Sequence, residues 1–437
     1  MFRLSPGQRS RRTGTISVLV AALVATLALV ACMPASASNV RVRHSLFGMH
    51  DGTPTSSSYG QVHEGALRLW DVGVQWQQVE TSPHHYQWGR LDQLVSAAHA
   101  RHAEVTMVVA GTPSFYSGTP WNVPAKQIAA YKAFVKAMMN RYRPDHWKYR
   151  GIAAYQVWNE ANIKTFWSGS VGRMAELTRA MDQVRDHVDR HVKVIGPAMV
   201  TRLKFELKGL ASYYHQRVGG LPVWRYVDAV GLSLYPQARY GRRAGVPEDS
   251  MGLLRAVKKA LHRDGVPGSK PIWNTEINYG LGSGSTKPIS AARQASNVMR
   301  TYLLNAAAGV KRIFWYRYDW GRLPDGGTLG NTLMTSPDSS SAVTPAGKAY
   351  LRAQQWMHGT LLGTQRSAPC AKDTHGTYTC VVKDGTRKRY IYWNPFHGAK
   401  VRLPKGVHHL QGVLGGKTSV KPRSLLKVAY KPVMVSR

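Results

Sequence analysis

Short apolar runs alternate with longer amphipathic stretches through most of this chain. Each apolar run is four to seven residues long, which is the length of a buried strand rather than of a helix. The runs that predict strands are Ser45–His50, Ala66–Leu69, Glu104–Ala110, Ala154–Trp158, Lys193–Gly196, Ala229–Ser233, Pro271–Asn274 and Arg312–Tyr316.

The stretches between these runs have the spacing of amphipathic helices. In Ala125–Tyr142, the side chains of Ile128, Tyr131, Phe134 and Met138 fall on one face of a helix with 3.6 residues per turn. Gly or Pro residues follow several of these stretches, at positions where helices commonly end. The other predicted helices are Leu91–Arg101, Met174–Val188, Ser250–His262 and Ala291–Ala308.

The order of these elements predicts the fold class. Eight predicted strands alternate with helices between residues 45 and 355, which is typical of an α/β fold with a closed (β/α)8 TIM barrel. We assign the barrel to residues 43–355. A doubly wound open sheet is the alternative, but no Gly-rich phosphate loop follows the first predicted strand, which argues against its dinucleotide-binding form.

A different pattern begins after residue 355. Residues 356–437 contain short β-type runs separated by Gly and Pro, which predicts a small β-rich domain. This segment carries 15 Lys and Arg against two Asp, so it is strongly basic. It is either a carbohydrate-binding module or a partner that packs on the barrel, and we favour packing. Its predicted strands include Tyr378–Lys383, Arg389–Trp393, Val401–Leu403 and Lys427–Tyr430.

The composition is that of a globular protein with a large excess of positive charge. The 437 residues are 43% hydrophobic and 19% charged, and the formal net charge is +36. The apolar fraction supports a packed core. The charge points either to polyanionic partners, such as an anionic polysaccharide or cell-wall polymer, or to a general habit of the lineage. Because the basic residues form no dense stripe with interleaved aromatic residues, we expect no nucleic-acid partner.

The N-terminus predicts export. Arg3, Arg9, Arg11 and Arg12 precede an apolar run over Ile16–Ala31. A charged region followed by such a run is typical of a signal peptide, and the run is too short for a convincing membrane span.

Two processing sites within residues 1–38 fit this leader. Leu29–Cys32 resembles a bacterial lipobox, in which Cys32 would be lipidated after cleavage, and Ala35–Ala37 resembles an ordinary small-residue cleavage site. We therefore expect a protein that is secreted, or anchored to the outer face of the cell membrane through a lipid on Cys32. Cys370 and Cys380 remain after the leader is removed, and in an exported protein we expect them to form a disulfide.

The candidate chemistry lies at the ends of two predicted strands. Asn159 and Glu160 follow the fourth strand, and Glu276 follows the seventh. Catalytic side chains of a barrel lie where strands end and loops begin. Glycoside hydrolysis needs two carboxyl groups, one as the acid and one as the nucleophile or base. These two glutamates therefore predict a glycosidase.

The segments around the two glutamates resemble those of a known group of enzymes. VWNEANIKTFW and WNTE are similar to the fourth- and seventh-strand motifs of retaining glycoside hydrolases of the (β/α)8 clan, clan A, and the first is most similar to the family 39-type branch. The resemblance also covers Arg68–Glu80, Tyr86–Val95 and Val108–Ser117. Ala161 departs from the Pro that is common in this motif, which should change loop stiffness without touching the chemistry.

The resemblance implies a role for each matched residue. Glu160 would be the general acid/base and Glu276 the nucleophile, and Asn159 would hydrogen-bond the sugar 2-hydroxyl. Arg68 would lie beneath Glu276 and keep it ionised. Two aromatic residues complete the implied set: Tyr235 would orient the nucleophile, and Trp315 would form a stacking floor for the sugar. Tyr316 and Tyr318, at the end of the same predicted strand, are the alternatives for that floor.

The remaining candidates come from their places in the predicted barrel. His50 ends the first strand and either reaches the pocket or is a buried structural histidine, and Trp167 either contacts sugar or packs within its loop. We expect no metal and no cofactor, because the histidines form no HExxH or His-x-His set beside a carboxylate cluster.

The main prediction is a monomeric, secreted retaining glycoside hydrolase that acts on a polysaccharide or oligosaccharide. The alternative is a non-catalytic carbohydrate- or cell-wall-binding protein on a TIM-barrel scaffold, held on anionic polymer by its basic β domain. An anionic substrate would require basic side chains at the barrel mouth, and Arg239, Arg242 and Arg243 are the candidates there.

Overall fold

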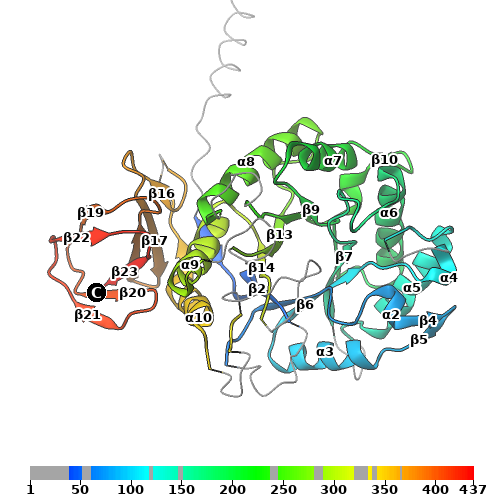
Figure 1. Ribbon diagram of the computed structural model, residues 1–437, viewed down its shortest axis with the longest axis horizontal. Coiled ribbons are helices and arrows are strands. Elements are labelled where there is room, and N and C mark those ends of the chain that lie inside the picture. The colour runs from blue at the N-terminus through cyan, green and yellow to red at the C-terminus, as the bar shows by residue number, and fades with distance from the viewer. Residues whose placement is uncertain are drawn as a thin grey trace, which may run out of the picture.

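A computed structural model describes residues 39–51, 61–117, 122–145, 151–236, 245–279, 289–318, 333–336, 342–364 and 367–437. Two bodies lie side by side in it, a large barrel surrounded by helices and a smaller β domain (Figure 1). Among the described residues, none of the helices combines the length and the apolar character needed to cross a lipid bilayer. The leader, with Cys32, lies outside the described residues.

Parallel strands form the barrel, and their order confirms the predicted fold. Within the described chain the hydrogen-bonded order is β8-β7-β6-β3-β2-β14-β13-β12-β9. β8 pairs with β7 whereas β9, which follows it after three residues, pairs with β12. The two ends of the sheet are therefore one interrupted strand, and a parallel bridge between Ile195 and Ala229 completes the closure. The strands are β2 (Phe47–His50), β3 (Ala66–Leu69), β6 (Glu104–Val109), β7 (Ile152–Val157), β8 (Lys193–Ile195), β9 (Met199–Val200), β12 (Val230–Ser233), β13 (Ile272–Ile277) and β14 (Arg312–Trp315).

Helices follow the strands and cover the outside of the barrel (Figure 1). The sequence pattern predicted α3, α5, α6, α8 and α9 but neither α7 nor α10. Gly209 interrupts the apolar pattern of α7, and α10 falls where the alternation of strand and helix was expected to stop. The helices are α2 (Trp76–Val79), α3 (Gly89–Ala100), α4 (Ser114–Ser117), α5 (Ile128–Arg141), α6 (Val171–Val188), α7 (Lys204–Tyr214), α8 (Pro247–Arg263), α9 (Ala291–Ala307) and α10 (Pro345–Met357), with 3-10 turns η1 (His44–Leu46) and η2 (Val223–Tyr226).

Small apolar and aromatic side chains fill the end of the barrel where the strands begin. This cluster is Ala66, Ala154, Ile195, Ala229, Trp273 and Phe314, each at most 3% exposed. The opposite end, where the strands finish, holds the polar residues described below. Short hairpins lie outside the barrel sheet: β4 (Glu80–Ser82) with β5 (His85–Tyr86), and β10 (Arg217–Val218) with β11 (Leu221–Pro222).

Antiparallel strands form the β domain. In its main sheet the described order is β1-β15-β17-β18-β23-β20-β21, with β16 beside β17, so β1 at the N-terminal end of the described chain joins the C-terminal domain. β19 and β22 form a separate two-stranded ribbon. The strands are β1 (Val40–Val42), β15 (Gly359–Leu361), β16 (Ala371–Lys372), β17 (Tyr378–Asp384), β18 (Arg387–Trp393), β19 (Ala399–Arg402), β20 (His409–Gly412), β21 (Lys417–Ser419), β22 (Leu425–Val428) and β23 (Val433–Ser436).

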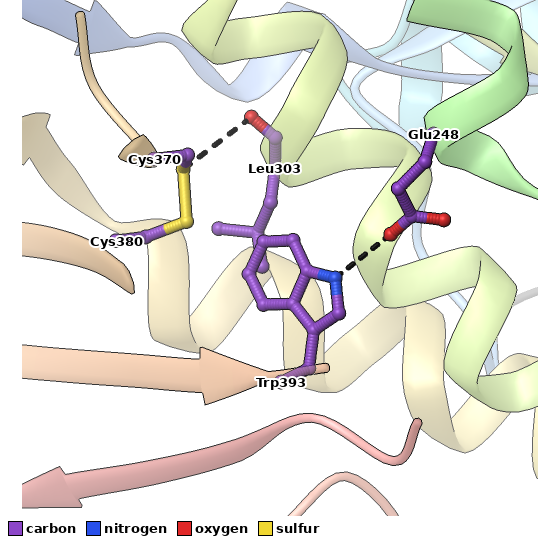
Figure 2. The surroundings of a disulfide bond; sticks show 5 residues. All are labelled: Glu248, Leu303, Cys370, Cys380 and Trp393. Atoms are coloured by element: carbon purple, nitrogen blue, oxygen red, sulfur yellow. Dashed lines mark hydrogen bonds between the residues drawn. A yellow bond between two sulfur atoms is a disulfide. The ribbon is translucent and has the colours of Figure 1, made fainter. Parts of the chain in front are cut away.

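The β domain packs directly on the barrel helices. Trp393 of β18 donates a hydrogen bond from Nε1 to Oε1 of Glu248 in α8 at 2.8 Å (Figure 2). Glu248 also accepts from the guanidinium of Arg300 in α9, whose side chain is 2% exposed. The predicted disulfide joins Cys370 to Cys380, and the sulfur of Cys370 lies 3.9 Å from the carbonyl oxygen of Leu303 in α9.

Candidate active site

Both predicted glutamates lie at the end of the barrel where the strands finish. Glu160 is the third residue after β7, and Glu276 is the penultimate residue of β13. The chain turns sharply at the first position, where Trp158 and Glu160 have φ values of 62° and 40°. Residues other than Gly rarely adopt this left-handed backbone conformation, and backbone strain of this kind is concentrated at functional sites. Glu160 is 7% exposed, so the turn leaves the carboxyl group buried.

Arg68 of β3 lies at the centre of the site. Its guanidinium donates from Nη1 to Oε2 of Glu276 at 3.2 Å, from Nη2 to Oδ1 of Asn159 at 2.7 Å and from Nε to Oε1 of Gln156 at 2.9 Å. The arginine side chain has no exposed surface. One buried cation on β3 therefore holds Gln156 of β7, Asn159 after that strand and Glu276 of β13 in a fixed arrangement.

His50 and Gln156 also contact this arginine. Nη1 of Arg68 lies 3.0 Å from Nε2 of His50. Nε2 of His50 also lies 3.2 Å from the carbonyl oxygen of Thr275. Burial, and then the charge of Arg68, hold the pKa of His50 well below its usual range, so the ring is neutral. Gln156 accepts from Arg68 and donates from Nε2 to the carbonyl oxygen of Trp158 at 2.7 Å. It therefore connects the arginine to the strained turn by hydrogen bonds.

Tyr235 orients the second glutamate. It follows β12, is 6% exposed, and donates its hydroxyl to Oε1 of Glu276 at 3.1 Å. Glu276 thus receives one donor on each carboxylate oxygen, from Tyr235 and from Arg68. Two donors of this kind stabilise the ionised carboxylate and fix its direction.

Burial raises the pKa of both carboxyl groups. Desolvation is the largest cause for each. The neighbouring charge of Glu160 raises the pKa of Glu276 further, whereas Arg68 lowers it; for Glu160 the main opposing charge is Arg202. Burial and the charge of Glu160 together raise the pKa of Glu276 to about 8, so the pair holds a proton near neutral pH.

The hydrogen bonds decide which carboxyl group carries that proton. Arg68 and Tyr235 both donate to Glu276 and therefore favour its charged form. Glu160 has no contact to a guanidinium within ion-pair distance in the described part of the chain. The donors from Arg68 and Tyr235 thus favour the form with the negative charge on Glu276 and oppose the burial that raises its pKa.

Asp71 and Tyr316 belong to the same cluster, and the sequence did not single out Asp71. The hydroxyl of Tyr316 donates to Oδ2 of Asp71, and Nη1 of Arg317 lies 3.5 Å from the same oxygen. The Tyr316 ring meets His50 edge to face, with centroids 5.0 Å apart. The position of Asp71 could have indicated it, because this residue follows the second strand, at the end of the barrel where catalytic side chains lie.

The structure does not bring Trp315 to the site. Successive strand residues point to opposite faces, and Phe314 points into the barrel. Trp315 therefore points outward into the main core, where it is fully buried and lies 6.3 Å from the ring of Tyr279. Tyr316, the next residue, takes the inward position that the resemblance had given to Trp315.

Trp167 and His50 are also buried. Trp167 is 4% exposed, donates from Nε1 to the carbonyl oxygen of Ser170 at 3.2 Å, and meets Trp158 edge to face at 4.9 Å. It packs within its loop. His50 has no exposed surface and acts on the site through Arg68. Arg239, Arg242 and Arg243 lie outside the described residues.

Comparison with known proteins places this fold among glycoside hydrolases. A glucosidase from Croceicoccus marinus has a TM-score of 0.66 at 12% identity, covering 91% of this chain and 96% of that one. A monomeric beta-xylosidase from Caulobacter crescentus CB15 has a TM-score of 0.63 at 16% identity, covering 92% and 97%. A family 39 glycoside hydrolase from Bacteroides cellulosilyticus WH2 has a TM-score of 0.60 at 15% identity, covering 85% and 75%.

These TM-scores establish a shared fold, and they confirm the resemblance to the (β/α)8 clan that the motifs indicated. No protein-family model matches the sequence, and no curated protein matches it either.

Proposed function

We propose that this protein is a retaining glycoside hydrolase that cleaves O-glycosidic bonds by double displacement. The observation that carries the proposal is the position of Arg68, which donates to Glu276 and to Asn159 at once. An ionised carboxylate beside a fixed amide is what a nucleophile and a 2-hydroxyl contact require. A buried arginine serving only stability would not need two partners at the ends of two catalytic-type strand motifs.

The first half of the reaction transfers the sugar to the enzyme. Glu160 gives its proton to the glycosidic oxygen as the bond from that oxygen to the anomeric carbon breaks. A carboxylate oxygen of Glu276 bonds to the anomeric carbon from the opposite face, giving a glycosyl ester. Tyr235 and Arg68 hold the attacking carboxylate in place, which reduces the entropy lost in reaching the transition state.

The second half releases the sugar. Glu160 is now ionised and takes a proton from water as the water oxygen bonds to the anomeric carbon and the ester bond breaks. The two displacements together retain the anomeric configuration. Glu160 needs a high pKa for the first half and access to water for the second. Burial raises its pKa, as the first half requires.

The proposed substrate is a polysaccharide or oligosaccharide. The chain carries a net charge of +36, which favours an acidic polymer over a neutral one. The solved structures with this fold include a glucosidase and a beta-xylosidase. We propose that the protein works as a monomer.

A non-catalytic sugar-binding protein is the second candidate. Loss of catalysis in such proteins would be expected to relax the nucleophile's surroundings. Here Glu276 keeps a donor on each oxygen and Asn159 keeps its contact with Arg68. The enzyme is therefore the proposal that accounts for more of the site.

We also propose that the protein is exported. The basic leader and the paired cysteines in the β domain support this. Mass spectrometry of the mature chain distinguishes the two processing sites. A chain that begins at lipidated Cys32 is membrane-anchored, one that begins at Ser38 is secreted, and an uncleaved chain contradicts the proposal.

The function is tested by release of reducing sugar from a panel of neutral and acidic polysaccharides. We expect release by the wild-type protein from at least one member and none by the Glu276→Gln variant. Equal release by both proteins would remove Glu276 from the mechanism. Binding of a polymer without release by either protein would support the sugar-binding candidate.

A further inference from the structure

The ribbon formed by β19 and β22 presents a cationic face to solvent. Its inward side chains, including Val401, Leu426 and Val428, pack against a small core of the β domain. Alternation along the strands then directs four side chains outward, and all four are exposed. They are Lys400, Arg402, Leu425 and Lys427.

The pairing of the two strands places like charges opposite one another. Lys400 is the direct partner of Lys427 in the antiparallel register, and Arg402 is the partner of Leu425. Like charges at directly opposite positions destabilise a strand pair. In the described part of the chain, none of the three cations forms an ion pair with a carboxylate. The ribbon therefore keeps a repulsive arrangement that folding alone does not favour.

The surrounding sequence supplies more cations and no acids. Residues 385–437 contain 12 Lys and Arg and neither Asp nor Glu. The turn leading into β22 adds two exposed cations, Lys421 and Arg423. Nη1 of Arg402 donates to the carbonyl oxygen of Arg423 at 3.1 Å, which ties that turn to the outward face. Arg423 holds a φ of 61°, an uncommon conformation for a residue other than Gly.

Apolar surface lies beside these charges. Leu425 is 57% exposed and Phe396, just before β19, is 53% exposed. A hollow of about 620 Å³ at the base of the ribbon is lined by Gly398, Ala399, Lys400, Lys427, Val428 and Ala429. A partner that fits this surface needs repeated negative charges and some apolar surface between them. The apolar faces of sugar rings provide the second property.

We propose that the outward face of the β19–β22 ribbon binds a linear anionic carbohydrate polymer, through phosphate or carboxylate groups spaced along it. This goes beyond the proposed function, because it assigns a binding surface to the β domain, away from the barrel end that holds Glu160 and Glu276. Contacts between Lys or Arg and a polyanion release counterions, so the affinity falls as salt concentration rises. The surface holds the protein on its polymer and leaves the barrel end free.

The test compares two triple variants with the same change in net charge. One is K400Q/R402Q/K427Q in the ribbon. The other is K136Q/K208Q/K259Q on barrel helices, at three exposed lysines. Each is made in the full-length Glu276→Gln protein, so that polymer is not consumed and binding is read independently of catalysis. The ligands are phosphorylated dextran and polygalacturonate, with unmodified dextran as the neutral polymer and duplex DNA as the rival polyanion, measured between 50 and 300 mM salt.

We expect the ribbon variant to bind one or both anionic carbohydrates about ten-fold more weakly than its parent, with a salt dependence reduced by about two counterions. The barrel variant should bind as its parent does. Preference for phosphate or carboxylate polymer identifies the group recognised. Three results would overturn the proposal: equal loss in both variants, binding to unmodified dextran as tight as to the anionic polymers, or tighter binding to duplex DNA. A thermal unfolding profile like that of the parent confirms that the ribbon variant is folded.

Discussion

Nη1 of Arg68 lies 3.2 Å from Oε2 of Glu276, and the arginine side chain has no exposed surface. A buried guanidinium at this distance favours the ionised carboxylate. The pair therefore lowers the pKa of Glu276 against burial and the charge of Glu160, which raise it to about 8.

Replacing Arg68 by Lys keeps the positive charge and removes the three directed hydrogen bonds of the guanidinium. A lysine ammonium is a point charge and cannot hold Glu276, Asn159 and Gln156 in fixed directions. We expect kcat/KM to fall by about 10²-fold. Because Glu276 loses a well-placed donor, its pKa rises, and the acidic limb of the pH profile should move to higher pH. The measurement is kcat/KM against pH.

Arg312→Lys is the matched control for this change. Arg312 also lies on a barrel strand and pairs with Glu104, but at the opposite end of the barrel. We expect its pH profile to coincide with that of the wild type. Equal shifts in the two variants would mean that Arg68 acts on stability alone.

Glu160→Gln should increase stability above neutral pH. Burial raises the pKa of Glu160 above its usual 4.5, so the folded state prefers the neutral carboxyl group. The favourable contribution of the neutral Glu160 carboxyl group to the free energy of folding is fully present below pH 4.5. It is lost as the pH rises through the raised pKa and the group ionises. The glutamine variant avoids that loss.

We expect the melting temperature of Glu160→Gln to exceed that of the wild type by about 1–2 °C at pH 8 and to equal it near pH 4. Calorimetry or fluorescence-detected unfolding across this range gives the comparison. A wild type that is the more stable protein at pH 8 would contradict the burial argument.

Tyr316 and Trp315 should respond differently to substitution. Tyr316→Phe removes the hydroxyl bonded to Asp71 and leaves the ring in place. We expect kcat/KM to fall by about ten-fold or more, since a hydrogen bond to a charged group is lost, while the melting temperature changes little. Trp315→Phe leaves a cavity in the core and should cost about 1–3 kcal/mol of stability with activity kept at 25 °C. The reverse pattern would restore Trp315 as the residue that faces the site.

The sequence predicted the barrel well because its strands are buried on both faces. Such strands appear as continuous apolar runs, as in β7, and the amphipathic helices between them carry a different period. The same property hides the direction of each side chain, because a run that is apolar throughout does not show which residues face inward. The error at Trp315 follows from this, since Phe314 and not Trp315 faces the barrel interior.

The site residues that belong to a sequence motif were predicted. Those that reach the site only through spatial proximity were missed. Glu160, Glu276, Asn159, Arg68 and Tyr235 lie together as the motifs implied. Gln156 was missed because a polar residue inside an apolar run gives no sign of its partner. Its role follows only from the 2.9 Å contact with Arg68, which is 88 positions away in the sequence.

Glu248 should be important for the packing of the β domain on the barrel. Its carboxylate is nearly buried and serves both Arg300 and Trp393. Glu248→Gln leaves the Arg300 charge buried without a countercharge, and we expect it to cost about 3–5 kcal/mol in chemical denaturation. Glu176→Gln, which breaks an exposed pair with Arg173, should cost less than about 1 kcal/mol. Similar costs for the two variants would show that the Glu248 contact is not stabilising.

Azide rescue is the most direct test of the division of roles between Glu160 and Glu276. Small anions enter the space left by a truncated carboxylate and attack the anomeric carbon. With an aryl glycoside carrying a good leaving group, Glu160→Ala plus azide should give a glycosyl azide of the same anomeric configuration as the substrate. Glu276→Ala plus azide should give the opposite configuration. Exchanged outcomes would reverse the two roles, and the absence of rescue in both variants would contradict the double-displacement mechanism.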